Sequence, residues 1–251
     1  MKVDALRTAE EYVASRLPGH RFPDLSDFTL DHDLCLSIAD WYEAAPHSSG
    51  TAGERHQYAV FKAETRRQYE AMRAAGVEVR PWVREGQPYR NSADLRREVT
   101  ATGVLYVYLT GNGHGQSGSS PGVAGHPMVE TSDYLIDGVR FVHNDVFRAV
   151  HDFFGHVAHG NPFSARGEFQ ATWDHCHMYP RDCHPVLLSE TIGQVCWFYF
   201  GAHLRDQDGR LPEPGSPGYV RPRDRPYSPQ KTTPMPQALV STYLSLMKQV
   251  N

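Results

Sequence analysis

The chain has 251 residues and a formal net charge of −4 at pH 7, from 25 Lys and Arg against 29 Asp and Glu. Hydrophobic residues make up 40% of the chain, which suffices for a large folded core and excludes a disordered or collagen-like protein. Because acidic residues outnumber basic ones, the protein has no excess of positive charge to attract a polyanion. We therefore expect no nucleic-acid partner.

Cysteine content and the N-terminal residues indicate the compartment. Four cysteines occur in a chain long enough to fold without disulfides. The first twenty residues carry charges such as Lys2, Asp4 and Arg7 in place of the apolar core of a secretory signal. The most apolar run, residues 195–202, is far shorter than the roughly 20 residues of a membrane helix. We therefore predict a cytoplasmic protein with no membrane partner.

The first third of the chain is predicted to be helical. Apolar residues recur at helical spacing over residues 4–17, and again over residues 31–45, where Asp31 is the expected N-cap. The longest helical pattern covers residues 54–75. It should end at Gly76, because glycine is favoured directly after a helix.

A change of period then predicts a small β element. Residues 77–83 alternate between apolar and polar types, and residues 103–110 are rich in β-branched and aromatic side chains. Residues 134–143 should form a hairpin around Asp137-Gly138.

A Gly/Ser-rich stretch, residues 111–125, joins two of the predicted strands. We interpret it as a flexible linker. A functional lid is the alternative, because the stretch carries His114 and is followed by His126.

The C-terminal half is predicted to be helical again. Helical patterns cover residues 145–159, 165–178 and 186–203. The Pro-rich residues 206–236 should wrap the surface without regular structure, and residues 237–249 should form a last helix.

Histidine is unusually frequent, and half of the 14 histidines lie between residues 143 and 184. In the segment NDVFRAVHDFFGHVAH, residues 144–159, the polar residues His151, Asp152 and His156 are embedded among apolar ones. Buried imidazoles and carboxylates need partners, and a metal ion is one such partner. Hydrogen bonding inside the core would explain a lone histidine, but the H-D-x-x-G-H string favours a metal.

The spacing of the two histidines constrains the geometry. At about 100° per residue, His151 and His156 are roughly 140° apart around an ideal helix, whereas Asp152 and His156 are roughly 40° apart. Either a π-type turn eased by Gly155 brings the histidines together, or Asp152 and His156 are the ligand pair.

The string HDFFGHVAHGNPFS, residues 151–164, resembles the metal-binding segment of the pterin-dependent aromatic amino acid hydroxylases. In that family two histidines five residues apart, in H-E-x-x-G-H, bind Fe(II) together with a glutamate about forty residues further on. The best match to this glutamate is Glu190, in LLSETIGQVCWFYFG. The resemblance implies a hydroxylase-like helical catalytic core, Fe(II) held by His151, His156 and Glu190, and dioxygen as a co-substrate.

The resemblance covers about residues 144–203, and some features depart from the family pattern. Asp152 stands where the family has a glutamate, and the spacing to the third ligand is shorter. A pterin is compatible with the resemblance, but no pterin-contacting motif is visible upstream of His151. The strings GEFQATWDH and SETIGQ also resemble uncharacterised proteins of actinobacteria and their phages, which imply no activity.

Glu168 and His175 lie between the two predicted ligand helices. Because they are seven residues apart, they face the same side of a helix. We predict that they orient substrate or move protons, and with Asp152 they form the predicted catalytic set. Roles as alternative ligands, including ligands of a second metal ion, or as a solvated helix face remain open.

The sequence thus predicts a single, mostly α domain with a small β element. Its expected function is that of a non-haem Fe(II) oxygenase that acts on a small molecule, for which an aromatic amino acid or a derivative is a candidate. A zinc or di-metal hydrolase built from the same residues is the alternative, because two histidines and a carboxylate also bind catalytic zinc. A non-catalytic protein with a structural metal site or a polar core is a third hypothesis.

Overall fold

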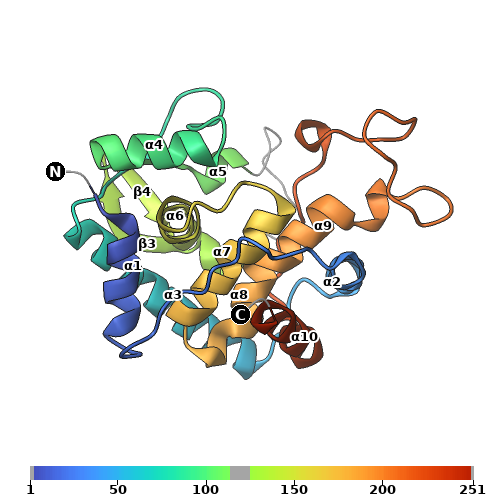
Figure 1. The fold of residues 1–251 in the computed structure, drawn as a ribbon, viewed down its shortest axis with the longest axis horizontal. Helices are drawn as coiled ribbons and strands as arrows, with labels where there is room; N and C mark the ends of the chain where they lie inside the picture. The colour runs from blue at the N-terminus through green and yellow to red at the C-terminus, as the bar shows by residue number, and fades with distance from the viewer. Residues whose placement is uncertain (1–2, 114–124, 250–251) are drawn as a thin grey trace.

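Helices make up most of the protein in the computed structural model, which describes residues 3–113 and 125–249 (Figure 1). The mostly α fold with a small β element is therefore confirmed. The α-helices are α1 (Ala5–Ala14), α2 (His32–Ala44), α3 (Ala52–Ala74), α4 (Ser92–Thr102), α5 (Thr110–Gly113), α6 (His143–His151), α7 (Ala165–Met178), α8 (His184–Leu188), α9 (Gln194–Phe200) and α10 (Gln237–Lys248). The strands are β1 (Glu78–Trp82), β2 (Val104–Tyr108), β3 (Thr131–Ile136) and β4 (Val139–Val142). Short 3₁₀ turns are η1 (Pro127–Val129), η3 (Arg181–Cys183), η5 (Ala202–Leu204) and η6 (Pro222–Asp224), and π-helical segments are η2 (Asp152–Ala158) and η4 (Ser189–Gly193).

The predicted start and end signals of the N-terminal helices are confirmed. The Asp31 carboxylate accepts a hydrogen bond from the Leu34 N–H at 3.0 Å, so α2 begins at the next residue. Gly76 follows the end of α3 with φ +93°, and its N–H donates to the carbonyl of Arg73 at 2.9 Å.

The strands form two separate two-stranded sheets. β1 and β2 pair in parallel, and the antiparallel pair β3 and β4 is joined by the predicted turn, in which Asp137 has φ +48° and Gly138 φ +79°. Residues 114–124 of the predicted linker lie outside the described residues.

A helix that the sequence analysis did not predict, α4, connects β1 to β2. The Asn91 side chain accepts a hydrogen bond from the Asp94 N–H at 2.9 Å, and Gly103, with φ +74°, ends the helix. Both cap signals are visible in the sequence, and parallel pairing of the flanking strands requires such a crossover.

Two of the predicted C-terminal helices contain a π-helical segment. α6 continues directly into η2, and α8 runs through η4 into α9. α6 begins at His143, and Asp145 accepts a hydrogen bond from the Val142 N–H at 2.9 Å, so Asp145 caps from inside the first turn. The π-type turn, one of the two alternatives for the histidine pair, is therefore present.

α6, η2 and α7 lie at the centre of the fold (Figure 1). α3 packs on α6, α1 and α4 pack on η2, and α2 packs on α9. One hydrophobic core extends from Val3 in the N-terminal segment to Met247 in α10.

The Pro-rich residues 206–236 are irregular apart from η6, but the expected surface position is wrong for their last part. Lys231 is 6% exposed, and its Nζ donates to the carbonyls of Tyr42, Glu43 and Ala45 at the end of α2. Carbonyls at a helix C-terminus lack partners within the helix, so a buried ammonium there satisfies them. This interaction draws residues 228–235 inward.

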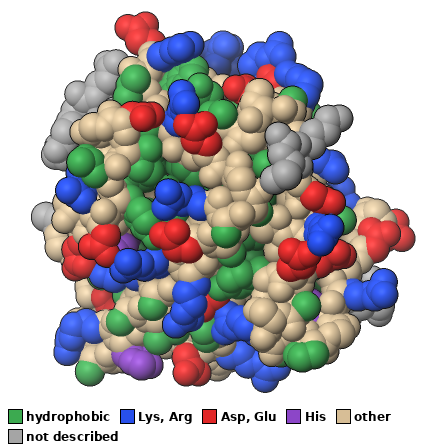
Figure 2. Space-filling view, turned by 90° about the vertical axis from the view of Figure 1, so that its left-hand side faces the viewer, with side chains coloured by type: hydrophobic (Ala, Val, Ile, Leu, Met, Phe, Trp, Pro, Cys, Tyr) green, Lys and Arg blue, Asp and Glu red, His purple; other side chains and the backbone are tan. Residues whose placement is uncertain are grey.

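The surface carries both signs of charge. On the face shown in Figure 2, Lys and Arg side chains are intermixed with Asp and Glu. Among the described residues, none of the helices combines the length and apolar character needed to cross a membrane.

A group of three histidines, His20, His159 and His177, joins the N-terminal segment to α7. The ring centroids of His20 and His177 are 4.6 Å apart, and Phe22 lies 4.3 Å from His159. Burial, reinforced by neighbouring imidazoles, lowers the pKa of His159 and of His177 to about 4. Both side chains are therefore neutral in the folded protein at pH 7.

We expect the free energy of unfolding to decrease as the pH falls from 6.5 to about 4, because these histidines take up protons in the unfolded chain before they do so in the folded one. The variant His177→Gln should lose less unfolding free energy than the wild-type protein over this pH range. The difference between the two losses should approach roughly 3 kcal/mol. Chemical denaturation between pH 4 and 7.5 measures the effect. The exposed His56→Gln variant is the control, and an unchanged slope in His177→Gln would contradict the interpretation.

Candidate metal centre

His151 and His156 meet because the helix changes its pitch between them. His151 is the last residue of α6, and His156 lies in η2, where backbone hydrogen bonds span five residues. Residues five apart share a face in a π-helix. The two Nε2 atoms accordingly lie 3.1 Å apart, which an ideal α-helix would prevent.

Gly155 lets η2 lie directly against α7. A Cβ at this position would be 2.9 Å from the Cβ of Ala171 and 3.5 Å from Nε2 of His175. Because the glycine has no side chain, the helix that carries Glu168 approaches both histidines closely.

Glu168 supplies a third ligand atom beside the two imidazoles. Its Oε2 lies 3.1 Å from Nε2 of His151, and its Oε1 lies 3.5 Å from Nε2 of His156. One oxygen of the carboxylate thus faces each histidine, and the three side chains can offer one ligand atom each within 4.8 Å of one another. Within the described residues, this set is the one group of three or more His, Cys, Asp or Glu that could hold a metal ion.

The hydrogen bonds of His156 fix which nitrogen faces the centre. Its Nδ1–H donates to the backbone carbonyl of Asn161 at 2.8 Å, so Nε2 presents a lone pair. Burial lowers the pKa of His156, which keeps the ring neutral. The Asn161 side chain is held in turn by the carbonyl of Gly155 and the carboxyl group of Asp174, each at 2.9 Å.

The charges of His151 and Glu168 are coupled. Burial alone would lower the pKa of His151, but the adjacent Glu168 carboxylate outweighs it and raises that pKa. Burial opposes ionisation of Glu168, yet His156 and His151 together lower the pKa of the carboxyl group. A metal ion would replace the proton that this pair shares.

His151 and Glu168 open onto a cavity of about 400 Å³. Asp152 lines the same cavity, and burial raises the pKa of its carboxyl group. The aromatic residues of the wall are Phe147, Phe163, Phe198, Tyr199 and Tyr227. The volume falls within the range of small-molecule sites.

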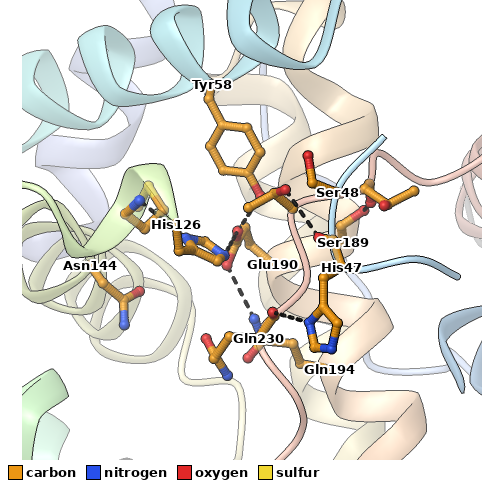
Figure 3. Close-up of polar contacts among 12 residues, drawn as sticks. His47, Ser48, Tyr58, His126, Asn144, Ser189, Glu190, Gln194 and Gln230 are labelled. Carbon is orange, nitrogen blue, oxygen red and sulfur yellow. Dashed lines mark hydrogen bonds and ion pairs between the residues drawn. The ribbon is translucent and has the colours of Figure 1, made fainter. Parts of the chain in front are cut away.

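Glu190, the expected third ligand, lies in η4 at another part of the cavity wall and outside the group of ligand atoms. Its Oε1 accepts a hydrogen bond from the Tyr58 hydroxyl and lies 3.3 Å from Nε2 of His126 (Figure 3). Its Oε2 accepts a hydrogen bond from the Gln194 amide at 3.1 Å. The structure therefore places Glu168, and not Glu190, beside the two histidines.

Glu168 and His175 lie on the same face of α7, as their spacing predicts, and this face meets His151. The rings of His175 and His151 stack with centroids 5.2 Å apart and an interplanar angle of 24°. Burial lowers the pKa of His175 well below its usual value, and neither ring nitrogen has a hydrogen-bond partner among the described residues. By stacking on the His151 ring, His175 supports that ring. The predicted role of His175 in proton transfer stays a prediction.

Three residues at the site were missed by the sequence analysis in these roles. Asn161 holds His156, and Tyr58 and His126 contact Glu190. Tyr58 lies in α3 and His126 precedes η1, so no helical spacing relates either residue to η4. Asn161 lies five residues after His156 and contacts it through its backbone carbonyl. Because every residue has such a carbonyl, the residue type at this position does not reveal the contact.

Comparisons of the chain with protein-family models, with curated proteins and with solved structures found no match.

We expect Gly155→Ala to disturb the centre, because the added Cβ would force η2 and α7 apart at Ala171. The free energy of unfolding should fall by about 1 to 3 kcal/mol, as in other overpacked cores, and metal affinity should fall with it. Thermal denaturation and metal titration measure the two effects. Gly53→Ala in the first turn of α3, where a Cβ meets ordinary contacts at 3.8 Å, is the control and should leave metal affinity unchanged without lowering the free energy of unfolding. Equal behaviour of the two variants would contradict the packing argument.

Proposed function

We propose that the protein is a non-haem Fe(II) oxygenase whose metal is bound by His151, His156 and Glu168. The observation that carries the proposal is the convergence of two imidazole nitrogens and one carboxylate, 3.1 to 3.5 Å apart, at the wall of a small-molecule cavity. No cysteine takes part, and this ligand set is typical of ferrous centres that use dioxygen.

The donor set fits the ion that the hydroxylase resemblance implies. His156 is neutral with its lone pair toward the centre and the pKa of Glu168 is lowered, so the proton that His151 shares with Glu168 is the one that a divalent cation would displace. Three ligands on one side of Fe(II) leave coordination positions open, and the ion supplies oxygen activation when it is bound. Glu168 takes the role that the family gives to a glutamate further along the chain.

The protein's own residues would control what reaches the metal. Aromatic side chains line the cavity beside the metal centre, and the carbonyl of Asn161 keeps the His156 ring in one orientation. Asp152 lies in the cavity wall with a raised pKa, which suits a group that holds a proton near bound substrate. The substrate is a small molecule, in keeping with a cavity of about 400 Å³.

A zinc hydrolase is the second candidate, and one observation favours it. Asp152 lies next to the His151 ligand and lines the cavity, where a carboxylate could act as a general base toward water. The identity of the bound metal and the need for dioxygen separate the two candidates.

The decisive experiment compares two carboxylates of the same cavity. Glu168→Gln removes the proposed ligand, whereas Glu190→Gln changes the ligand that the sequence alone suggests. We expect wild-type protein purified without chelators to hold about one iron per chain, and its reduced form to give a high-spin ferrous-nitrosyl signal with nitric oxide. Glu168→Gln should lose metal affinity by about 100-fold or more, and Glu190→Gln should keep its metal content.

Elemental mass spectrometry and electron paramagnetic resonance provide the readouts. Zinc without a nitrosyl signal would favour the hydrolase. Wild-type protein without any stoichiometric metal would contradict both candidates, and loss of metal in Glu190→Gln but not in Glu168→Gln would contradict the ligand assignment.

A further inference from the structure

One part of the cavity wall is formed by polar side chains that are not part of the metal centre. Five residues, Asn144, Glu190, Gln194, Ser228 and Gln230, line the cavity and are here called the acceptor wall. They come from α6, η4, α9 and the Pro-rich segment, and Figure 3 shows Asn144, Gln194 and Gln230 together with Glu190. Their hydrogen bonds determine which atoms remain for a ligand.

The amide of Asn144 uses one of its two N–H donors inside the protein. Its Nδ2 donates to Oγ1 of Thr110 at 3.0 Å, while the Thr110 hydroxyl donates its own proton to Asp145 at 2.7 Å. Thr110 can therefore only accept from Asn144, which fixes the orientation of the amide. The Oδ1 atom of Asn144 has no partner among the described residues.

The other neutral members of the acceptor wall also donate to the protein. Gln194 donates to the Glu190 carboxylate at 3.1 Å, and Gln230 donates to the carbonyl of Ser228 at 3.0 Å. Both partners are acceptors only, so both amide orientations are fixed. The Ser228 hydroxyl donates to the carbonyl of Gln194 at 2.7 Å. Each of the three amides keeps its side-chain oxygen and one further N–H, so the charge of Glu190 is what distinguishes this wall.

Glu190 adds a negative charge to this wall. Tyr58 and His126 approach Oε1, and Gln194 takes one position on Oε2. The His126 Nδ1 accepts from the Met128 N–H at 3.1 Å, so its Nε2 carries the proton that faces Glu190. A carboxylate offers about four lone-pair positions, and one on Oε2 remains for a ligand. The side chain is 3% exposed, so bulk water hydrates this charge poorly.

Among the described residues that line the cavity, Arg148 is the one Lys or Arg. It also borders a neighbouring cavity of about 160 Å³ together with Asp152 and Phe163, and its Nη1 donates to the carbonyl of Tyr108 at 3.2 Å. Arg148 therefore lies between the two cavities, beside Asp152 and one turn of α6 after Asn144.

We propose that the acceptor wall binds a cationic nitrogen of the substrate, an ammonium or amidinium group attached to an apolar or aromatic body. Such a group brings several N–H donors and a positive charge to a wall with one buried carboxylate, and the amide oxygens of Asn144, Gln194 and Gln230 can accept its remaining N–H groups. The body of the molecule lies against Phe147, Phe198 and Tyr199. This inference rests on the proposed function, because the reacting atom must face His151 and Glu168.

The test measures binding of small probes to the full chain by isothermal titration calorimetry. Benzylammonium and benzamidinium carry the proposed cation, benzyl alcohol is a neutral analogue of similar size, and benzoate is an anionic one. We expect each cation to bind at least about tenfold more tightly than benzyl alcohol, as a charge-assisted hydrogen bond requires. Benzoate should not bind better than benzyl alcohol.

Two variants assign the preference to the acceptor wall. Glu190→Gln keeps the shape of the side chain and should weaken binding of the cations by about tenfold, with benzyl alcohol unchanged. Asn144→Asp adds a second carboxylate and should strengthen binding of the cations. Equal affinity of the neutral and cationic probes for the wild-type protein, or an unchanged preference in both variants, would overturn the proposal.

Repeating the titrations on metal-depleted protein, with metal content measured on every sample, separates this proposal from the proposed function. Cation preference in a chain that binds no metal would leave the acceptor wall correct and the oxygenase wrong. A chain that binds metal but shows no cation preference would contradict the acceptor wall and leave the proposed metal centre correct.

Discussion

His151, His156 and Glu168 lie close together because η2 and α7 are in direct contact at Gly155, where only the Ala171 methyl group lies between them. Gly155 provides this contact, since a Cβ there would fall 2.9 Å from Ala171. The π-helical turn around Gly155 brings His151 and His156 to one face, and the close approach of α7 adds Glu168. The cavity, the stacked ring of His175 and the hydrogen bond from His156 to the following loop all depend on this packing.

Local features of the fold follow from the sequence because each rests on a few neighbouring residues. Asp31 caps α2, Gly76 ends α3, and Asp137-Gly138 forms the hairpin turn, as their backbone requirements predict. The same logic applied to the separation of His151 and His156 led to a π-turn as one of two alternatives. The helix α4 was not predicted, although Asn91 caps it. It lies between the two predicted strands, and the helical pattern of its residues was not recognised there.

The pairing of distant elements could not be predicted in this way. Helical spacing shows that Glu168 and His175 share a face, but not that this face meets η2. The resemblance to the hydroxylases directed attention to Glu190, which instead contacts Tyr58 and His126. These contacts join three parts of the chain: α3, the segment that precedes η1, and η4. No periodicity along the chain relates the three. Burial of Lys231 under the end of α2 has the same origin, since the three carbonyls that attract it belong to a helix about 190 residues earlier.

The central proposal is that a metal ion binds at His151, His156 and Glu168. Diffraction can locate such an ion directly. Crystals of protein loaded anaerobically with Fe(II) should show one anomalous peak at the iron edge. We predict that this peak lies about 2.0 to 2.2 Å from Nε2 of His151, Nε2 of His156 and a carboxylate oxygen of Glu168. A peak bound by Glu190 in place of Glu168, or the absence of a peak at the two histidines, would contradict the account.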